Sequence, residues 1–212
     1  MKGLFITFEG LDGSGKTTQI KLLHDFLKKK GLDAVVTMEP GGTAVGEKIR
    51  DALLSKRYSG MDYKTEALLF LASRAELMSK VIMPALNNGS IVICDRFFDS
   101  TVVYQGIARK LGKEQILNMS LWACSNVVPD LTFLLSIKVG KGEERIKITN
   151  REKDRIESEK DLFKEKICKG YLEIAEENKD RFIVLDGGKD IQSIFGEIKD
   201  NVERVLKEKR LI

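Results

Sequence analysis

The chain has few cysteines, and their spacing does not suit a metal site or a disulfide framework. Three occur in 212 residues: Cys94, Cys124 and Cys168. They lie far apart, are odd in number and form no C-x-x-C pair, which argues against a structural metal. We therefore expect free thiols in a reducing compartment, and a cytoplasmic protein.

Long apolar runs, internal repeats and linkers rich in proline or glycine are also lacking. No run approaches the roughly 18 residues of a membrane-spanning helix. The first apolar segment, residues 4–8, reads as a strand and lies directly after the N-terminus. We expect neither a membrane partner nor a signal peptide. With no shift in composition to mark a boundary, we expect one domain over residues 1–212.

A strong excess of either charge is absent as well. Lys and Arg total 36 against 32 Asp and Glu, and the resulting +4 is spread along the chain. We expect no nucleic-acid partner, because such proteins gather basic residues on one face or tail. A phosphorylated small molecule fits this charge equally well. The single histidine, His24, is assigned no chemistry.

What the sequence does contain is a complete phosphate-loop pattern. Residues 10–17 read GLDGSGKT and satisfy G-x-x-x-x-G-K-[ST]. The glycines let successive backbone N–H groups face a polyphosphate, Lys16 reaches its outer oxygens, and the Thr17 hydroxyl is placed for Mg²⁺. The residues expected to hold the phosphates are Gly10, Leu11, Asp12, Gly13, Ser14, Gly15, Lys16 and Thr17.

Strand and helix patterns alternate around this loop. The strands are predicted at residues 4–8, 34–38, 91–96, 131–135 and 182–186. The apolar residues after the loop recur at helical spacing up to Gly31, and helical segments separate the other strands. The alternation predicts an α/β protein with the three-layer P-loop NTPase fold, a five-stranded parallel sheet with helices on both faces.

Two segments between the strands stand out. A long helical pattern begins near Asp62, a suitable N-cap, and continues to Gly89, with Pro84 expected to bend its last turn. Residues 140–155 are dense in charge, which is usual for a solvated helix face. Because this stretch follows a strand of a nucleotide-binding sheet, we predict a cationic lid at about residues 139–155.

Polar residues follow two strands at the sheet edge where ligands bind. Glu39 and Pro40 open a glycine-containing loop after the second strand; an ordinary turn is the alternative. Asp95 and Arg96 end the third strand. Asp95 and Thr17 are predicted to hold Mg²⁺, Asp95 through water, and Arg96 to grip a phosphate. A salt bridge at the strand end is the alternative for this pair.

In order and spacing, these pieces resemble thymidylate kinases of the bacterial type over nearly the whole chain. The segments that carry the resemblance are the phosphate loop, residues 39–43 (EPGGT), residues 70–74 (FLASR), Asp95-Arg96 with Ser100 and Tyr104-Gln105-Gly106, and residues 154–157 (DRIE). The resemblance implies transfer of a phosphoryl group from ATP to dTMP, giving dTDP and ADP in deoxythymidine nucleotide synthesis. It also implies Mg²⁺ and a homodimer formed through the long helices.

The resemblance implies site residues too. Arg50 and Arg96 match arginines that bind the acceptor phosphate, Phe70 the ring that stacks on thymine, and Arg74 the donor to thymine O4. Asp12 lies toward the acceptor sugar and the metal. The implied dTMP-binding residues are Glu39, Pro40, Arg50, Phe70, Arg74, Arg96, Ser100, Thr101, Tyr104 and Gln105.

The lid departs from the family pattern. Bacterial-type members supply an arginine from the lid, often in an R-x-R-x-R series, whereas this chain reads RIKITNR over residues 145–151. Arg145, Lys147 and Arg151 are the candidates for the cation at the transferring phosphoryl group. Phe97 replaces the tyrosine common after Asp-Arg. The implied catalytic residues are Lys16, Arg96, Asp12, Asp95, Arg145 and Arg151.

The chemistry agrees with this set of cations. A phosphate monoester is mostly dianionic at neutral pH, so the acceptor needs no base to remove a proton. A kinase for another nucleoside monophosphate remains an alternative. A deoxynucleoside kinase would need a carboxylate base, for which Glu39 is the candidate. A guanine-selective switch would carry an N/T-K-x-D loop, and none occurs.

Overall fold

The computed structural model describes residues 3–148 and 152–212. Five strands form one sheet in the order β2-β3-β1-β4-β5, with each neighbouring pair parallel. Their bounds are β1 (Leu4–Glu9), β2 (Ala34–Met38), β3 (Ile91–Asp95), β4 (Leu131–Ser136) and β5 (Phe182–Asp186). The predicted fold class is confirmed, and each predicted strand is present.

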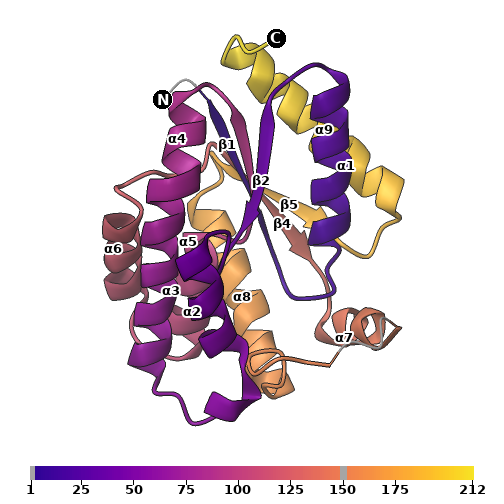
Figure 1. Cartoon of the computed structure of the whole chain (residues 1–212). Helices are drawn as coiled ribbons and strands as arrows, with labels where there is room; N and C mark the ends of the chain where they lie inside the picture. Colours follow the sequence, from indigo (N-terminus) through magenta and orange to yellow (C-terminus); the bar gives the residue numbers. More distant parts are fainter. Residues whose placement is uncertain (1–2, 149–151) are drawn as a thin grey trace.

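Helices cover both faces of the sheet, and Figure 1 shows the two groups. One face carries α1 (Lys16–Lys29) and α9 (Ile191–Glu208). The other group consists of α2 (Ala44–Leu54), α3 (Tyr63–Leu77), α4 (Met83–Asn87), α5 (Phe98–Thr101), α6 (Lys113–Ala123) and α8 (Asp161–Glu177). Helix α7 (Val139–Ile148) lies near the end of β4 and contacts α8 (Figure 1). Within the described ranges, no helix combines the length and apolar character needed to cross a membrane.

Successive side chains along each strand point to opposite faces of the sheet, so they pack in two separate hydrophobic cores. Leu4, Ile6 and Phe8 of β1 pack against α1 and α9, whereas Phe5 packs in the core of the opposite face. Glu9 therefore shares a face with Phe5. By the same rule Asp95 shares the α1 face with Ile93, so the two carboxylates leave the sheet in opposite directions.

The long helical pattern is interrupted. Asp62 caps α3 as predicted: its Oδ1 accepts from the N–H groups of Lys64 at 2.9 Å and Thr65 at 3.2 Å. The π-helical segment η2 (Met78–Ile82) then separates α3 from α4. Pro84 lies in α4, which follows η2 directly with helical backbone at Ile82 and Met83, and the expected bend of the last turn stays a prediction.

The third strand is one residue shorter than predicted. β3 ends at Asp95, and Arg96 adopts a left-handed conformation with φ of 70°. This conformation is uncommon for a residue with a Cβ and turns the chain sharply out of the sheet. A second π-helical segment, η3 (Val102–Ala108), continues α5 and carries Tyr104 and Gln105. Arg96 and the η3 residues Tyr104 and Gln105 line a cavity.

Candidate active site

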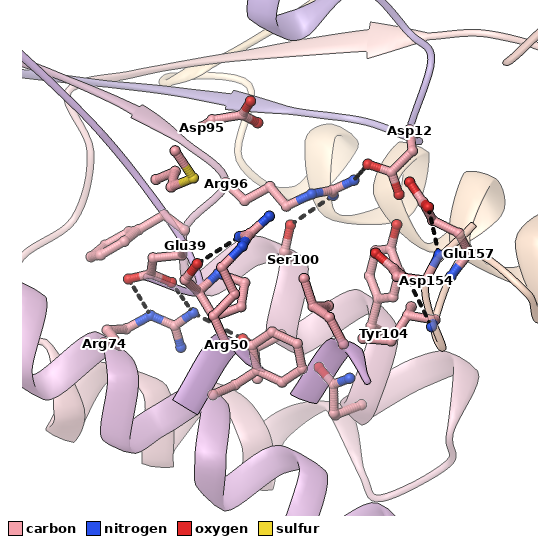
Figure 2. A pocket seen from close by; sticks show the side chains of 18 of the residues that line it. Asp12, Glu39, Arg50, Arg74, Asp95, Arg96, Ser100, Tyr104, Asp154 and Glu157 are labelled. Atoms are coloured by element: carbon pink, nitrogen blue, oxygen red, sulfur yellow. Dashed lines mark hydrogen bonds and ion pairs between the residues drawn. The ribbon is translucent and has the colours of Figure 1, made fainter. Parts of the chain in front are cut away.

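A cavity of about 370 Å³ opens at the carboxyl edge of the sheet. All of the implied dTMP-binding residues line it: Glu39, Pro40, Arg50, Phe70, Arg74, Arg96, Ser100, Thr101, Tyr104 and Gln105. Asp12, Thr17 and Asp95 line it as well. Figure 2 shows these side chains converging from the sheet edge above and the helices below. Residues separated by more than 90 positions in sequence thus share one concave site.

The phosphate loop leads directly into α1, as the motif requires. Gly15 has φ of 101°, which lets the loop turn into the helix, and α1 begins at Lys16. Lys16 is buried, and its Nζ donates to the carbonyls of Gly10 and Leu11 at 3.1 Å each. Burial lowers the pKa of Lys16, and the Arg96 charge lowers it further. An anion in the loop would offset both effects.

Thr17 and Asp95 meet beside the loop. Thr17 Oγ1 donates to Asp95 Oδ2 at 3.4 Å, whereas Asp95 Oδ1 is buried and has no hydrogen-bond partner among the described residues. A hydroxyl and an unsatisfied carboxylate oxygen suit Mg²⁺, which takes oxygen ligands and retains water. The described chain groups no three His, Cys, Asp or Glu side chains into a metal site. Substrate phosphates and water would have to complete the coordination.

Arg96 spans the cavity between the loop and the helices. Its Nη2 donates to Asp12 Oδ1 at 2.8 Å, and its Nη1 donates to Ser100 Oγ at 3.2 Å and Tyr171 OH at 3.1 Å. The Tyr104 ring lies 5.4 Å from the guanidinium carbon. The left-handed backbone of Arg96 aims this side chain across the cavity, where it can meet an acceptor phosphate (Figure 2).

Arg74 and Glu39 form a buried ion pair at the opposite end. Arg74 Nε donates to Glu39 Oε1 at 3.1 Å, Nη2 donates to Glu39 Oε2, and Nη2 also donates to Thr101 Oγ1 at 2.9 Å. Burial raises the pKa of Glu39, and the Arg74 charge opposes that rise. Arg74 Nη1 is buried and finds no partner within residues 3–148 and 152–212. One nitrogen of the Arg74 guanidinium is therefore left without a described partner.

Gln105 has a defined amide orientation. Its Nε2 donates to Glu66 Oε1 at 2.8 Å, and a carboxylate can only accept, so the nitrogen must face Glu66. Gln105 Oε1 is buried, with no hydrogen-bond partner in the part of the chain that is described. Arg74 and Gln105 both line the cavity, and each carries a buried polar atom, a donor on Arg74 and an acceptor on Gln105, that has no partner among the described residues.

The predicted lid residues lie elsewhere. Arg145, on α7, donates to the carbonyls of Gly13 at 3.3 Å, Ser14 at 3.5 Å and Gly187 at 3.0 Å, beside the phosphate loop and outside the lining of the cavity. Lys147 belongs to the same helix. Arg151 lies outside the described residues. In this structure Arg145 therefore contacts the phosphate loop and does not line the cavity.

Sequence reasoning missed two residues behind Arg96. Glu9 is fully buried and accepts from Phe97 N at 2.8 Å, Ser100 Oγ at 2.5 Å and Tyr171 OH at 2.8 Å. Burial raises the pKa of Glu9 to about 7, and the Asp99 charge adds to the rise. Glu9 could have been noticed as a carboxylate closing an apolar strand before the phosphate loop. Tyr171 lies on α8 and left no local signal.

The remaining predicted residues fit around these pairs. Arg50 Nη1 donates to Pro40 O at 2.7 Å, across a loop that includes a cis peptide bond between Glu39 and Pro40. Phe70 lies one helical turn before Arg74 on α3 and lines the same cavity. An aromatic ring, a guanidinium with a spare donor and an amide with a spare acceptor suit a flat heterocycle that can hydrogen-bond at its edge.

Comparison with known proteins identifies relatives along nearly the whole chain. Residues 8–198 match the family model described as thymidylate kinase. A thymidylate kinase of Thermosipho melanesiensis is 45% identical over 203 residues, covering 96% of this chain and 99% of that protein. One of Geobacillus is 45% identical over 196 residues, covering 92% of this chain and 93% of that protein.

A solved structure extends the comparison to the fold. The crystal structure of thymidylate kinase from Ehrlichia chaffeensis superposes with a TM-score of 0.75 at 32% identity, covering 95% of this chain and 99% of that chain. The agreement in sequence and in fold leads to one assignment. The chain belongs to the thymidylate kinase family.

Proposed function

We propose that the cavity holds dTMP while the phosphate loop holds ATP, so that the γ-phosphoryl group passes to the acceptor phosphate between them. The reaction is that of the family: ATP and dTMP give ADP and dTDP. No observation favours the alternative of another nucleoside monophosphate as the preferred acceptor. In the cell this step supplies deoxythymidine nucleotides.

The unsatisfied pair of polar atoms carries the assignment of the base. Thymine presents O4 as an acceptor and N3–H as a donor, which complement Arg74 Nη1 and Gln105 Oε1. Cytosine presents an amine and an unprotonated ring nitrogen at the same positions, so both contacts would be mismatched. Buried polar groups left unpaired reject a ligand strongly. Phe70 provides an aromatic face for stacking on the pyrimidine.

The cations near the sheet edge account for the chemistry. The acceptor phosphate is a dianion and a sufficient nucleophile, so positioning and charge neutralisation are what the protein must supply. We assign Lys16 to the outer phosphates of ATP and Arg96 and Arg50 to the acceptor phosphate. Asp12 would orient Arg96 and face the acceptor sugar. Thr17 and Asp95, the latter through water, would hold Mg²⁺, which neutralises phosphate charge when bound.

We further infer that residues 1–212 form one domain with a lid inside the predicted range of about 139–155, and we assign the lid to α7 (Val139–Ile148). Arg145 donates to the carbonyls of Gly13 and Ser14, and this contact with the phosphate loop supports a role for Arg145 near the donor nucleotide. Because Arg145 reaches the loop from outside the acceptor cavity, it would contact the donor nucleotide first. Lys147 and Arg151 stay candidates for the cation on the transferring group.

A homodimer is the proposed assembly. Leu68 on α3 is 55% exposed and Trp122 on α6 is 79% exposed, and these helices are neighbours. Large apolar side chains exposed on adjacent helices favour contact with a second copy. Cys94, Cys124 and Cys168 are free thiols, which supports our proposal of a reducing cytoplasm. Neither nucleic acid nor a membrane is a proposed partner.

The proposal is tested by coupled detection of ADP with a panel of nucleoside monophosphates and Mg²⁺. We expect dTMP to be used best, dUMP about 10- to 200-fold less efficiently because it lacks one methyl group, and dCMP at least about 10⁴-fold less efficiently. Comparable kcat/KM values for dTMP and dCMP would refute the assignment of Arg74 and Gln105. ADP release that does not depend on any added monophosphate would refute the transfer reaction.

A further inference from the structure

Arg155, in the segment that follows the lid, is 7% exposed and does not line the cavity. Its backbone N–H donates to Leu54 O at 3.0 Å, and its side-chain Nε donates to Leu53 O at 2.8 Å. These are the last carbonyls of α2, which have no partners within that helix. Arg155 therefore caps the carbonyl end of α2 and attaches the segment after the lid to that helix.

The same guanidinium also reaches α3. Arg155 Nη1 lies 2.6 Å from Glu66 Oε2, and Glu66 is fully buried. Glu66 Oε1 accepts hydrogen bonds from Arg109 Nε at 3.2 Å and from the Gln105 amide nitrogen. The guanidinium carbon of Arg109 lies 4.4 Å from the centroid of the Tyr63 ring and 4.2 Å from that of the Phe163 ring, so both rings hold this side chain in place. Glu66 is thus a rigid anchor shared by the segment after the lid and by the amide that faces the base.

What the anchor holds in place is a wall of the cavity. Asp154 Oδ1 accepts from Ile156 N at 2.9 Å and Glu157 N at 2.8 Å, and Glu157 Oε2 accepts from Asp154 N at 3.0 Å. This reciprocal cap makes residues 154–157 one stiff turn. Asp154, Ile156 and Glu157 line the cavity, while Arg155 points from the same turn toward Glu66 (Figure 2 labels Asp154 and Glu157).

We propose that the Arg155–Glu66 pair is a latch that holds the turn at residues 154–157 against the acceptor nucleotide. Both residues are positioning residues and act without touching substrate. Glu66 also holds Gln105, so one carboxylate places the cavity wall and the base-facing amide relative to each other. The inference rests on the proposed function, because it assigns the cavity to dTMP.

The chain offers a matched control in the same region. Lys56 Nζ lies 3.6 Å from Glu152 Oε2, so this ion pair also joins the chain just after α2 to the segment after the lid. Its side chains are 56% and 93% exposed, and exposed pairs contribute little. Lys56→Met removes an ion pair between the same two segments and leaves the buried latch intact.

The test measures KM for dTMP and for ATP in wild type, Arg155→Met, Arg155→Lys and Lys56→Met, each with its thermal midpoint. For Arg155→Met we expect the KM for dTMP to rise about tenfold, with the KM for ATP within about twofold of wild type. Arg155→Lys keeps a charge but cannot bond α2 and Glu66 together, so its KM for dTMP should be intermediate. Lys56→Met should match wild type in both constants.

The readout separates a latch from a stabilising contact. A lower thermal midpoint with the KM for dTMP unchanged, in whichever arginine variant folds, overturns the proposal. Equal increases in both KM values overturn it too, since the latch contacts only the acceptor side. Failure of the proposed function would look different, because wild type itself would then not turn over dTMP.

Discussion

Arg74 and Glu39 are 35 residues apart in sequence and form a buried ion pair that joins α3 to the loop after β2. Their side chains are 1% and 3% exposed, and Arg74 donates to both carboxylate oxygens. Two charges taken out of water depend on each other: either alone would be strongly destabilising. The pair also fixes the orientation of the Arg74 guanidinium, which lines the cavity.

Removing one partner should therefore cost more than removing both. We expect Arg74→Met to lower the free energy of unfolding by about 3–5 kcal/mol, because Glu39 is left buried without its counter-ion. The Arg74→Met, Glu39→Gln double variant should recover part of that loss. Urea unfolding at pH 7 measures both. A double variant that is less stable than either single variant would contradict the interpretation.

The approach of α7 to the phosphate loop depends on Gly142. A Cβ placed there would lie 2.6 Å from Asp12 O and 2.9 Å from Ile137 Cδ1, so alanine would push the helix away from the loop. We expect Gly142→Ala to raise the KM for ATP about tenfold while the KM for dTMP changes little. Steady-state kinetics with each substrate varied provide the measurement.

Gly140 is the matched control for that substitution. It lies in the same helix, and a Cβ there would meet nothing within 4 Å. Gly140→Ala should keep wild-type kinetics and stabilise α7 slightly, since alanine favours helix over glycine by about 1 kcal/mol. If both variants raised the KM for ATP alike, helix flexibility and not contact with the loop would be the cause.

The metal assignment predicts a specific defect in Asp95→Asn. The substitution keeps the shape of the side chain but removes the charge of the carboxylate beside Thr17. Loss of an orienting carboxylate costs about 10- to 100-fold in metal affinity, so half-maximal activity should need at least about tenfold more Mg²⁺. A Mg²⁺ titration at saturating ATP and dTMP measures this. An unchanged Mg²⁺ requirement would rule out the role of Asp95.

Glu9 makes stability depend on pH. Burial raises its pKa from 4.5 to about 7, so the folded state binds more protons than the unfolded chain between these values. Its stabilising contribution is complete below about pH 4.5 and is lost as the pH rises through about 7, a change of about 3 kcal/mol. Glu9→Gln cannot ionise, so its free energy of unfolding should vary less with pH than that of wild type.

Urea unfolding of both proteins at half-unit steps from pH 5 to pH 8 tests this difference. When the free energy of unfolding is plotted against pH, the two proteins should differ in slope, with wild type losing stability relative to Glu9→Gln as the pH rises. Parallel curves over this range would mean that Glu9 does not change its protonation there. The Ser100 and Tyr171 hydroxyls would then be bonded to one fixed form of the carboxyl group.

The main features of the fold followed from local patterns. Strand and helix differ in their apolar period, so the five strands and the helix after the phosphate loop were predicted within about one residue at most ends. The motif predicted a helix after the phosphate loop, because the required conformations lie within eight consecutive residues, and α1 begins at Lys16. Departures came at irregular backbone: the π-helical segment η2, and Arg96 turning out of β3.

The amino-acid sequence by itself determined the phosphate loop, the alternating parallel sheet and the family, since each depends on residues close together or on their order. Tertiary structure alone decided the partners: Glu39 for Arg74, Tyr171 for Glu9, Glu66 for Arg155, and the phosphate-loop carbonyls for Arg145. Such pairs join residues 35 to 162 positions apart. Buried charges and hydroxyls take whichever partner the packed helices bring within reach, and no local pattern records that choice.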